Sequence, residues 1–339
     1  MRNGMNIAGV SEVVHEVQAE PHEAVYRYGA AAEWHTGRGI RARNEPAVLG
    51  TVKSPRRFEL AVAEENDPGR GGGPTPVRLA LTALGACALT TFIGGASARG
   101  VTLESLRLAL GAEQVRDGTS GRITDLTYTL TVRADTGGVD LAEVLAGVEE
   151  RSPNHRTLVD PQPLTLVLDG AGEPVPAPTA PAAGRGLPVS ATVTWSYSVQ
   201  LVATTDGDPA ELRVDQPKQL AGVDWGPNPQ EYLLMALASC VLGRVAELSA
   251  RPGRPPHPWR VRATGQVDIR GLFDIGDDPT VPVHRLTLEV TPLDAATARA
   301  EDWRDTVREA VRRSPVAALL TAGHPVKVEL DAGAEAAHG

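Results

Sequence analysis

The stretch GPNPQEYLLMALASC, residues 226–240, decides the fold because it returns in similar form earlier in the chain. Residues 73–87 read GPTPVRLALTALGAC, and a shift of 153 positions (226 minus 73) aligns the two copies without a gap. Each copy ends in one of the chain's two cysteines, Cys87 and Cys240. A chain of 339 residues with such a repeat predicts two homologous domains.

A second repeated motif lies downstream of each cysteine. Arg151-Ser152-Pro153 matches Arg313-Ser314-Pro315 at a shift of 162 (313 minus 151), so the second half carries an insertion between its two motifs. Between the halves, residues 170–188 are rich in proline, alanine and glycine, which is typical of a semi-extended linker. The sequence therefore predicts one domain over residues 20–169, this linker, and a second domain over residues 189–332.

The segment that carries Cys240 is predicted to be a helix. Asn228 is a good N-cap, Pro229 suits the first helical position, and Glu231 at the third lies near the positive helix end. The same spacing gives an Asn-x-x-Glu analogue of the capping box, so we interpret Glu231 as a cap rather than a catalytic partner. In the first copy Arg78 takes the place of Glu231, where the helix dipole disfavours a cation.

Segments of alternating polarity predict strands on both sides of this helix, and a later helix is predicted in each half. The predicted strands include residues 126–132, 164–168, 191–195 and 326–330, and the later helices are residues 141–150 and 300–312. Helices and strands do not alternate one for one, so the predicted fold class is α+β.

Composition excludes several classes of protein. A net charge of −9 argues against nucleic acid or an anionic membrane as the main partner. No apolar run approaches the ~20 residues of a membrane span, and the N-terminus lacks the apolar core of a signal peptide. Two cysteines cannot build a disulfide framework, so we expect a cytoplasmic protein. The abundant alanine, arginine, glycine and proline are typical of a high-GC bacterial genome.

Neither a metal nor a cofactor is predicted. The histidines show no metal-ligand spacing, and the glycine-rich segment at residues 69–73 lacks the lysine of a phosphate-binding loop.

The residues alone leave two interpretations of the cysteines. Free cysteine is among the most buried residue types, and an alanine- and leucine-rich helix is where a packing cysteine sits. Both copies nevertheless keep a cysteine when the chain has no others, which favours a functional thiol. Arg244 lies one turn beyond Cys240 on the same helix face, and a thiolate this far from the helix N-terminus needs a nearby cation.

The helix motif G-x-x-P-x-E-x-L-x-x-A-L-x-x-C, with a later R-S-P before the last strand, resembles the OsmC/Ohr family of thiol-dependent hydroperoxide reductases. The resemblance covers most of the chain. Family members are usually intertwined homodimers, with antiparallel sheets wrapped around central cysteine-bearing helices and a site at each subunit interface. The resemblance implies that this tandem chain is a monomer that folds as a pseudo-dimer of two OsmC-like domains.

By the same resemblance, Cys87 and Cys240 take the position of the peroxidatic cysteine, and Arg38 that of the thiolate-stabilising arginine. A guanidinium can lower a thiol pKa and hold a peroxide oxygen. His155, beside the late motif, is a candidate donor to the substrate or to Cys87. Arg244 is a further candidate pocket residue.

The departures from the family pattern are specific. Ser152 and Ser314 stand where the family has its resolving cysteine, so a sulfenic acid cannot close an internal disulfide in the usual way. The family's acid partner, ten residues before the cysteine, is replaced by Val77 in one half and Gln230 in the other. The two sites are therefore expected to be unequal.

Three functions are compatible with these residues. The first is a one-cysteine reductase of organic hydroperoxides that depends on an external thiol. The second is a diverged enzyme whose cysteine attacks, or carries sulfur to, an electrophilic small metabolite. The third is a non-catalytic module that binds a small molecule.

Overall fold

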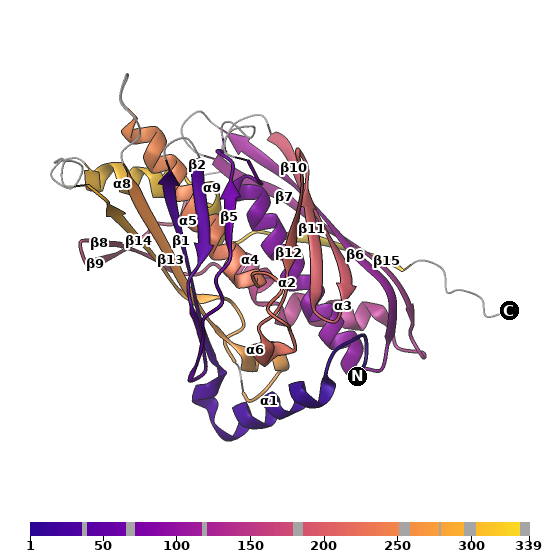
Figure 1. Cartoon of the computed structure of the whole chain (residues 1–339). Coiled ribbons are helices and arrows are strands. Elements are labelled where there is room, and N and C mark those ends of the chain that lie inside the picture. Colours follow the sequence, from indigo (N-terminus) through magenta and orange to yellow (C-terminus); the bar gives the residue numbers. More distant parts are fainter. Residues whose placement is uncertain are drawn as a thin grey trace.

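The computed structural model describes residues 1–35, 39–65, 72–116, 121–178, 186–250, 258–277, 279–294 and 303–332. Two long helices, α2 (Pro76–Ala98) and α5 (Pro229–Ser249), lie side by side between two β-sheets (Figure 1). They are the two copies of the repeated motif, and Cys87 and Cys240 lie on them, both buried. Helix α5 packs on the first sheet and α2 on the second.

The first sheet has nine strands and takes them from both halves of the chain. Its main path runs β4-β3-β1-β13-β14-β8-β9, and β2 and β5 extend it beside β1. The strands are β1 (Val25–His35), β2 (Gly39–Asn44), β3 (Ala47–Leu49), β4 (Val52–Ser54), β5 (Glu59–Val62), β8 (Leu164–Leu168), β9 (Ala171–Pro174), β13 (Trp259–Asp268) and β14 (His284–Pro292).

The second sheet has six strands in the order β12-β11-β10-β6-β7-β15. The strands are β6 (Thr102–Arg116), β7 (Gly121–Asp135), β10 (Gly186–Tyr197), β11 (Gln200–Thr205), β12 (Asp208–Val214) and β15 (Val326–Ala332). The four-strand unit β10-β6-β7-β15 repeats the unit β1-β13-β14-β8 of the first sheet, with the two halves of the chain exchanged.

The last strand of each half completes a sheet with strands of the other half. Strand β8 pairs in parallel with β14, where Leu286 is opposite Leu164. Strand β15 pairs in parallel with β7, where Val326 is opposite Leu126. Neither half can therefore form its full sheet alone, because unpaired strand edges would be left in both. The intertwined pseudo-dimer that the resemblance implied is the observed arrangement.

Shorter helices close the ends of the two layers. They are α1 (Ile7–Ala19), η1 (Pro21–Ala24), α3 (Leu141–Arg151), α4 (Pro153–Val159), η2 (Lys218–Leu220), α6 (Ile269–Phe273), α8 (Trp303–Arg313) and α9 (Pro315–Thr321). The predicted helices over residues 141–150 and 300–312 correspond to α3 and α8, although residues 300–302 lie outside the described part. The four predicted strands are all present, within β7, β8, β10 and β15.

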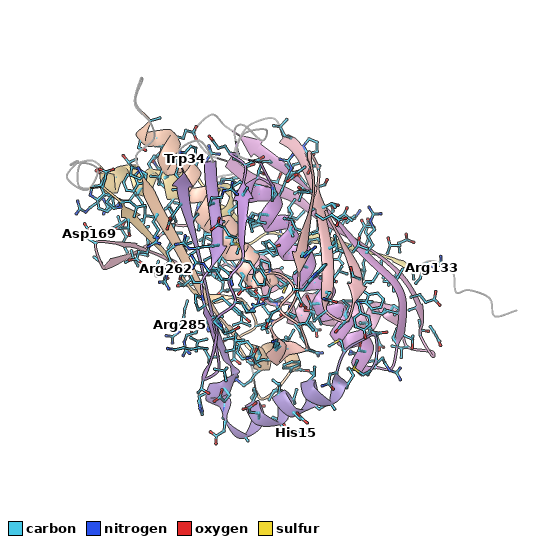
Figure 2. The ribbon with its side chains drawn as sticks, in the orientation of Figure 1. His15, Trp34, Arg133, Asp169, Arg262 and Arg285 are labelled. Carbon is cyan, nitrogen blue, oxygen red and sulfur yellow. The ribbon has the colours of Figure 1, made fainter. Side chains whose placement is uncertain are left out.

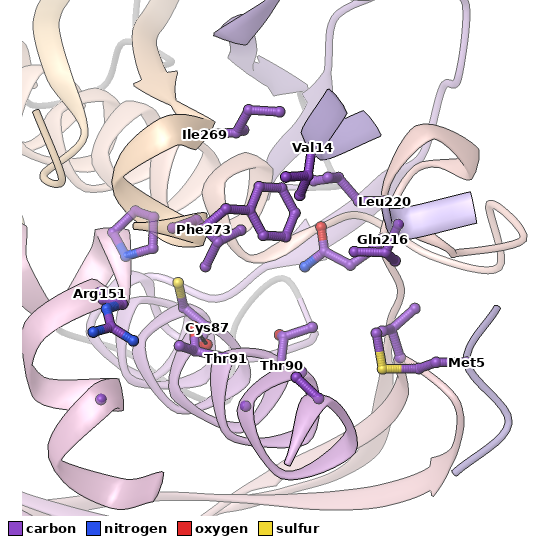
Figure 3. Close-up of a pocket in the computed structure, with 18 of the residues that line it drawn as sticks. Met5, Val14, Cys87, Thr90, Thr91, Arg151, Gln216, Leu220, Ile269 and Phe273 are labelled. Carbon is purple, nitrogen blue, oxygen red and sulfur yellow. Dashed lines mark hydrogen bonds between the residues drawn. The ribbon is translucent and has the colours of Figure 1, made fainter. Parts of the chain in front are cut away.

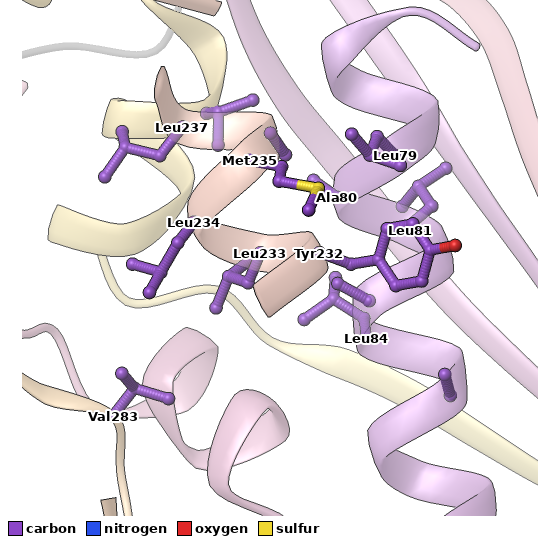
Figure 4. Packing of buried hydrophobic residues seen from close by; sticks show 14 of the residues in the cluster. Leu79, Ala80, Leu81, Leu84, Tyr232, Leu233, Leu234, Met235, Leu237 and Val283 are labelled. Atoms are coloured by element: carbon purple, nitrogen blue, oxygen red, sulfur yellow. The ribbon is translucent and has the colours of Figure 1, made fainter. Parts of the chain in front are cut away.

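The core lies where α2 and α5 meet. Leucine side chains of one helix pack against apolar side chains of the other, as Figure 4 shows for Leu81 and Leu84 beside Tyr232 and Met235. Gly85 lets α2 approach the second sheet, because a Cβ there would lie 2.4 Å from Leu110 Cδ1. Charged side chains such as Arg262 and Arg133 lie toward the outer surface (Figure 2).

The start of α5 confirms the predicted cap and adds a partner that the sequence did not indicate. Asn228 Oδ1 accepts from the Glu231 amide at 2.8 Å, and Glu231 Oε2 accepts from the Asn228 amide at 2.7 Å. The Glu231 side chain is fully buried, where its other oxygen lies 2.8 Å from Arg56 Nη2 and accepts from Asn44 at 2.8 Å. A buried carboxylate needs such a partner because desolvation is costly. Residues of the first half therefore hold the first turn of the second half's helix.

Arg78, the counterpart of Glu231 in α2, also has a structural reason. Its guanidinium donates to both carboxylate oxygens of Asp206, at 3.0 and 2.7 Å. Asp206 lies between β11 and β12, in the other half. This ion pair outweighs the unfavourable helix dipole at that position.

Two features differ from the sequence-based expectations. The segment 170–188, predicted as a linker, contains β9 and the first residues of β10; its residues 179–185 lie outside the described part. By length and composition α2 and α5 are each apolar enough to cross a membrane, so the prediction that no such segment exists is wrong. However, 78% and 72% of those windows are buried inside the protein, so packing between the sheets accounts for their apolar character.

Candidate functional site

A cavity of about 430 Å³ opens beside Cys87 and is lined by both halves of the chain (Figure 3). Its floor is one face of α2, and its walls come from α3, β1, β13 and α6. Helix α1 lies across it and contributes Met5, Ile7, Val10 and Val14 from its own residues and those just before it. A cavity of this size suits a small-molecule ligand.

The sulfur of Cys87 is surrounded by uncharged hydrogen-bond donors. The Asn154 amide donates to it over 3.5 Å, and Gln230 Nε2 donates over 3.4 Å. Asn154 is fixed in turn, because its side-chain amide donates to the carbonyls of Ala83 at 2.9 Å and Pro229 at 3.2 Å. Asn154 lies on α4 and Gln230 on α5, so the packing of these two helices against α2 positions both donors.

The protonation of Cys87 follows from this environment. Burial raises the pKa of the Cys87 thiol above its ordinary value. The Ser152 hydroxyl, the Asn154 amide and the Gln230 side chain act in the opposite direction, because they stabilise the thiolate. Among the residues that the structure describes, no cation lowers this pKa. The resting form of Cys87 at neutral pH is therefore the thiol.

Gln230 lies beside Cys87 and not beside the cysteine of its own helix. In sequence it stands ten residues before Cys240, which puts it about 15 Å away along the helix at about 1.5 Å per residue. Because the two halves exchange strands, the start of α5 lies against the helix of the other half. The first turn of α5 therefore reaches the middle of α2. The site at Cys87 is thus built from Ser152 and Asn154 of the first half and Gln230 of the second.

Cys240 has a different and more charged environment. Burial raises its pKa to about 11, the Arg244 guanidinium lowers it, and the Glu65 carboxylate raises it. Ser314 and the Val316 amide also lower it, as Ser152 and Asn154 do for Cys87. Cys240 does not line the cavity at Cys87.

Arg244 is a largely buried cation on the same helix as Cys240. It stands one turn after Cys240, and its side chain is only 11% exposed. It donates to Glu247 at 2.6 Å, which leaves its positive charge shared between that carboxylate and the thiol. In α2 the corresponding residue is Thr91, so α2 carries no cation one turn after its cysteine.

The remaining candidates stand as follows. Ser152 lies beside Cys87 and Ser314 beside Cys240. His155 is buried, packs edge-on against the Tyr128 ring with centroids 5.8 Å apart, and does not line the Cys87 cavity. Burial lowers the pKa of His155 to about 4, so it is neutral at physiological pH. Arg38 lies outside the described residues.

Sequence reasoning missed α1 as part of the site. The apolar residues Ile7, Val10, Val14 and Val17 recur at helical spacing, so the signal was present, but these residues precede the repeat. It also missed Arg151, which lines the cavity and pairs with Asp274 at 2.9 Å. Among the described residues that line the cavity, none is an aspartate or glutamate. No cluster of metal-ligating side chains occurs within the described ranges.

The architecture and the buried cysteines define an α+β protein with two interlocked copies of one thiol-bearing unit. A family model for OsmC-like protein matches residues 69–167 and 221–330, which together are more than half of the chain. The chain belongs to the OsmC-like family, and the two matched segments agree with a tandem duplication. A comparison with curated proteins found no match.

Proposed function

We propose that the protein reduces organic hydroperoxides at Cys87 by a one-cysteine route. The observation that carries this proposal is a cysteine at the wall of a largely apolar cavity, with two hydrogen-bond donors on its sulfur. An apolar cavity takes an organic peroxide in preference to hydrogen peroxide, because burial of the apolar group stabilises the complex. The donors stabilise the thiolate that must form for attack.

The reaction balances with a small external thiol. The Cys87 thiolate bonds to the terminal peroxide oxygen, the O–O bond breaks, and the alkoxide leaves and takes a proton to become an alcohol. Cys87 is then a sulfenic acid. One external thiol displaces water to form a mixed disulfide, and a second releases Cys87 as a thiol. Ser152 cannot do this work, so the reductant must reach the cavity from outside.

A second function, binding of an apolar small molecule without turnover, is favoured by one specific observation. Burial raises the pKa of both thiols, and no cation among the described residues lowers the pKa of Cys87. The reactive cysteine of an efficient thiol peroxidase usually has a pKa below that of a free cysteine, not above it. The family resemblance makes Arg38 the thiolate-stabilising residue, so replacement of Arg38 is a further test of the reductase proposal.

Dimedone trapping separates the two functions. The reduced protein is treated with one equivalent of cumene hydroperoxide and then with dimedone, and the labelled peptide is identified by mass spectrometry. Label on Cys87, absent from Cys87→Ser and retained in Cys240→Ser, supports the reductase. If both thiols remain unlabelled although they are confirmed as reduced, the reductase proposal fails and the binding function stands.

A further inference from the structure

Gln216 contributes a buried side-chain amide to the wall of the Cys87 cavity. The residue is only 8% exposed, and it lines the cavity. Its backbone amide donates to Asp215 Oδ1 at 2.9 Å, but no residue in the described part of the chain pairs with its side-chain amide. Burying an unpaired amide costs free energy, so this group is typical of a place where a ligand supplies the missing hydrogen bonds.

The main chain at Gln216 is held rigidly. Asp215 is fully buried, and its carboxylate accepts from the backbone amides of Gln216, Val223 and Trp225, each at 2.9 Å. A Cβ at Gly222 would lie 1.6 Å from the Gln216 carbonyl oxygen, so the chain folds back closely against Gln216. The side chain therefore extends into the cavity from a fixed point, which lowers the entropy lost when a ligand binds to it.

Three other polar side chains of the wall are already paired within the protein. Gln230 Nε2 donates to the Cys87 sulfur and to Asn154 Oδ1, both at 3.4 Å. Thr90 and Thr91 donate their hydroxyl protons to backbone carbonyls one turn earlier in α2. These groups have a weaker need for a ligand than an amide without a partner.

The two arginines of the wall also have partners, and both reach solvent. Arg151 pairs with Asp274 at 2.9 Å, and its side chain is 30% exposed. Arg99 is exposed and donates to the Gly95 carbonyl at 3.3 Å. Water can hydrogen-bond to these guanidinium groups while a ligand fills the cavity, so they do not demand a polar group from it.

We propose that Gln216 binds the oxygen-bearing group of the ligand, and that the cavity therefore selects oxygenated molecules over hydrocarbons of the same shape. In Figure 3 the Gln216 amide points into the space that the Cys87 sulfur also faces. A side-chain amide can donate to a ligand oxygen and accept from an O–H group, so an alcohol or a hydroperoxide can make both bonds. A hydrocarbon that displaces water from the amide replaces neither bond and loses affinity.

The same contact gives Gln216 a part in the proposed reduction. Hydrogen bonds from the amide hold the hydroperoxide group in the space that Cys87 faces, which keeps the O–O bond within reach of the sulfur. This step rests on the proposed function, whereas the recognition of an oxygen-bearing group does not.

The test compares two probes with the same apolar body, 2-phenyl-2-propanol and cumene, which differ by one hydroxyl group. Binding of each is measured as protection of Cys87 from iodoacetamide, because a ligand in the cavity covers the sulfur and no turnover is needed. Gln216→Met keeps the length of the side chain and should weaken binding of the alcohol roughly fivefold or more, while binding of cumene stays equal or becomes tighter. Thr91→Val is the matched control, and its preference for the alcohol should equal that of the wild type.

An unchanged preference for the alcohol in Gln216→Met would overturn the proposal. An equal loss of preference in Thr91→Val would also overturn it, because the selection would then belong to the wall in general. If Gln216→Met does not fold, as judged by circular dichroism, Gln216→Leu removes the same amide and should give the same result.

Dimedone labelling of Cys87, followed in parallel, separates this inference from the reductase proposal. A lowered preference for the alcohol in Gln216→Met, with no labelling of the wild type, keeps the role of Gln216 and removes the reductase. Labelling of the wild type with an unchanged preference in Gln216→Met does the reverse.

Discussion

Gln230 Nε2 lies 3.4 Å from the Cys87 sulfur, although the two residues are 143 positions apart and belong to different copies of the repeat. The contact exists because each sheet takes strands from both halves, which sets the start of α5 against the middle of α2. A site at this position is therefore shared between the copies. Neither copy would assemble it alone.

Replacement of Gln230 by valine should make Cys87 less reactive. The variant copies Val77, its counterpart in α2, and removes one donor from the sulfur while it keeps the site packed. Loss of a hydrogen bond worth about 1 kcal/mol raises the pKa of Cys87 and lowers its thiolate population roughly fivefold. The rate of alkylation of Cys87 by iodoacetamide at pH 7.5 reports this change.

The control for that experiment is Cys240 in the same sample. Gln230 makes no contact with Cys240, so peptide mass spectrometry should show its alkylation rate unchanged. An unaltered rate at Cys87 would mean that Gln230 does not stabilise the thiolate.

The protein should lose stability in alkaline solution because of its buried thiols. The pKa of Cys240 rises from 9.0 to about 11 on folding, so above pH 9 the unfolded chain releases a proton that the folded chain keeps. The unfolded state then binds fewer protons, and the free energy of unfolding falls as the pH rises. The contribution is fully present below pH 9 and decreases by about 2–3 kcal/mol by pH 11.

Urea unfolding between pH 8 and pH 11 measures this change. The wild type should lose more stability over this range than Cys240→Ser, which has no thiol to titrate at that position. Parallel curves for the two proteins would show that Cys240 titrates normally in the folded state.

Release of the N-terminal segment should expose Cys87 and leave Cys240 unaffected. Asn3→Asp keeps a residue that tolerates the positive φ of 49° at this position but removes the amide that donates to Ser97 and to the Val101 carbonyl. We expect Cys87 to react at least threefold faster with a bulky maleimide, because α1 then covers the cavity for a smaller fraction of the time. The ratio of labelling at Cys87 to labelling at Cys240, read by mass spectrometry, cancels any global change in stability. A constant ratio would show that α1 does not control access.

Much of the fold could be predicted from the sequence because the repeat is strong and local signals agree with it. The cap at Asn228, the helices that carry the cysteines and the four predicted strands depend on residues close together in the chain. The family resemblance implied an intertwined pseudo-dimer, but the exchange of β8 and β15 between halves was not predicted, because periodicity shows that a strand forms but not which strand it pairs with.

The site was predicted only in part, for the same physical reason. Arg244 follows Cys240 by one helical turn, and the late motif of each repeat supplies a serine, Ser152 or Ser314. The structure places each of these three residues near a thiol. Gln230 was predicted as a pocket residue, but its contact with Cys87 could not be, because the sequence of one helix does not show which neighbouring helix its first turn meets. Arg56 gave no signal, since an arginine of an Arg-Arg pair before a strand is usually a solvated charge.

Removal of Arg56 should be among the most destabilising single changes in the protein. Its side chain is 4% exposed and pairs with Glu231, which is 0% exposed. Burial raises the pKa of Glu231, and Arg56 acts against that rise. Arg56→Met leaves an unpaired buried carboxylate, which typically costs about 3–5 kcal/mol in the free energy of unfolding.

The double variant Arg56→Met with Glu231→Gln removes the charge as well and should recover at least half of that loss in urea unfolding at pH 7. A double variant as unstable as Arg56→Met would show that Arg56 acts through contacts other than Glu231, and its 3.3 Å hydrogen bond to the Gly226 carbonyl would be the first of these to test.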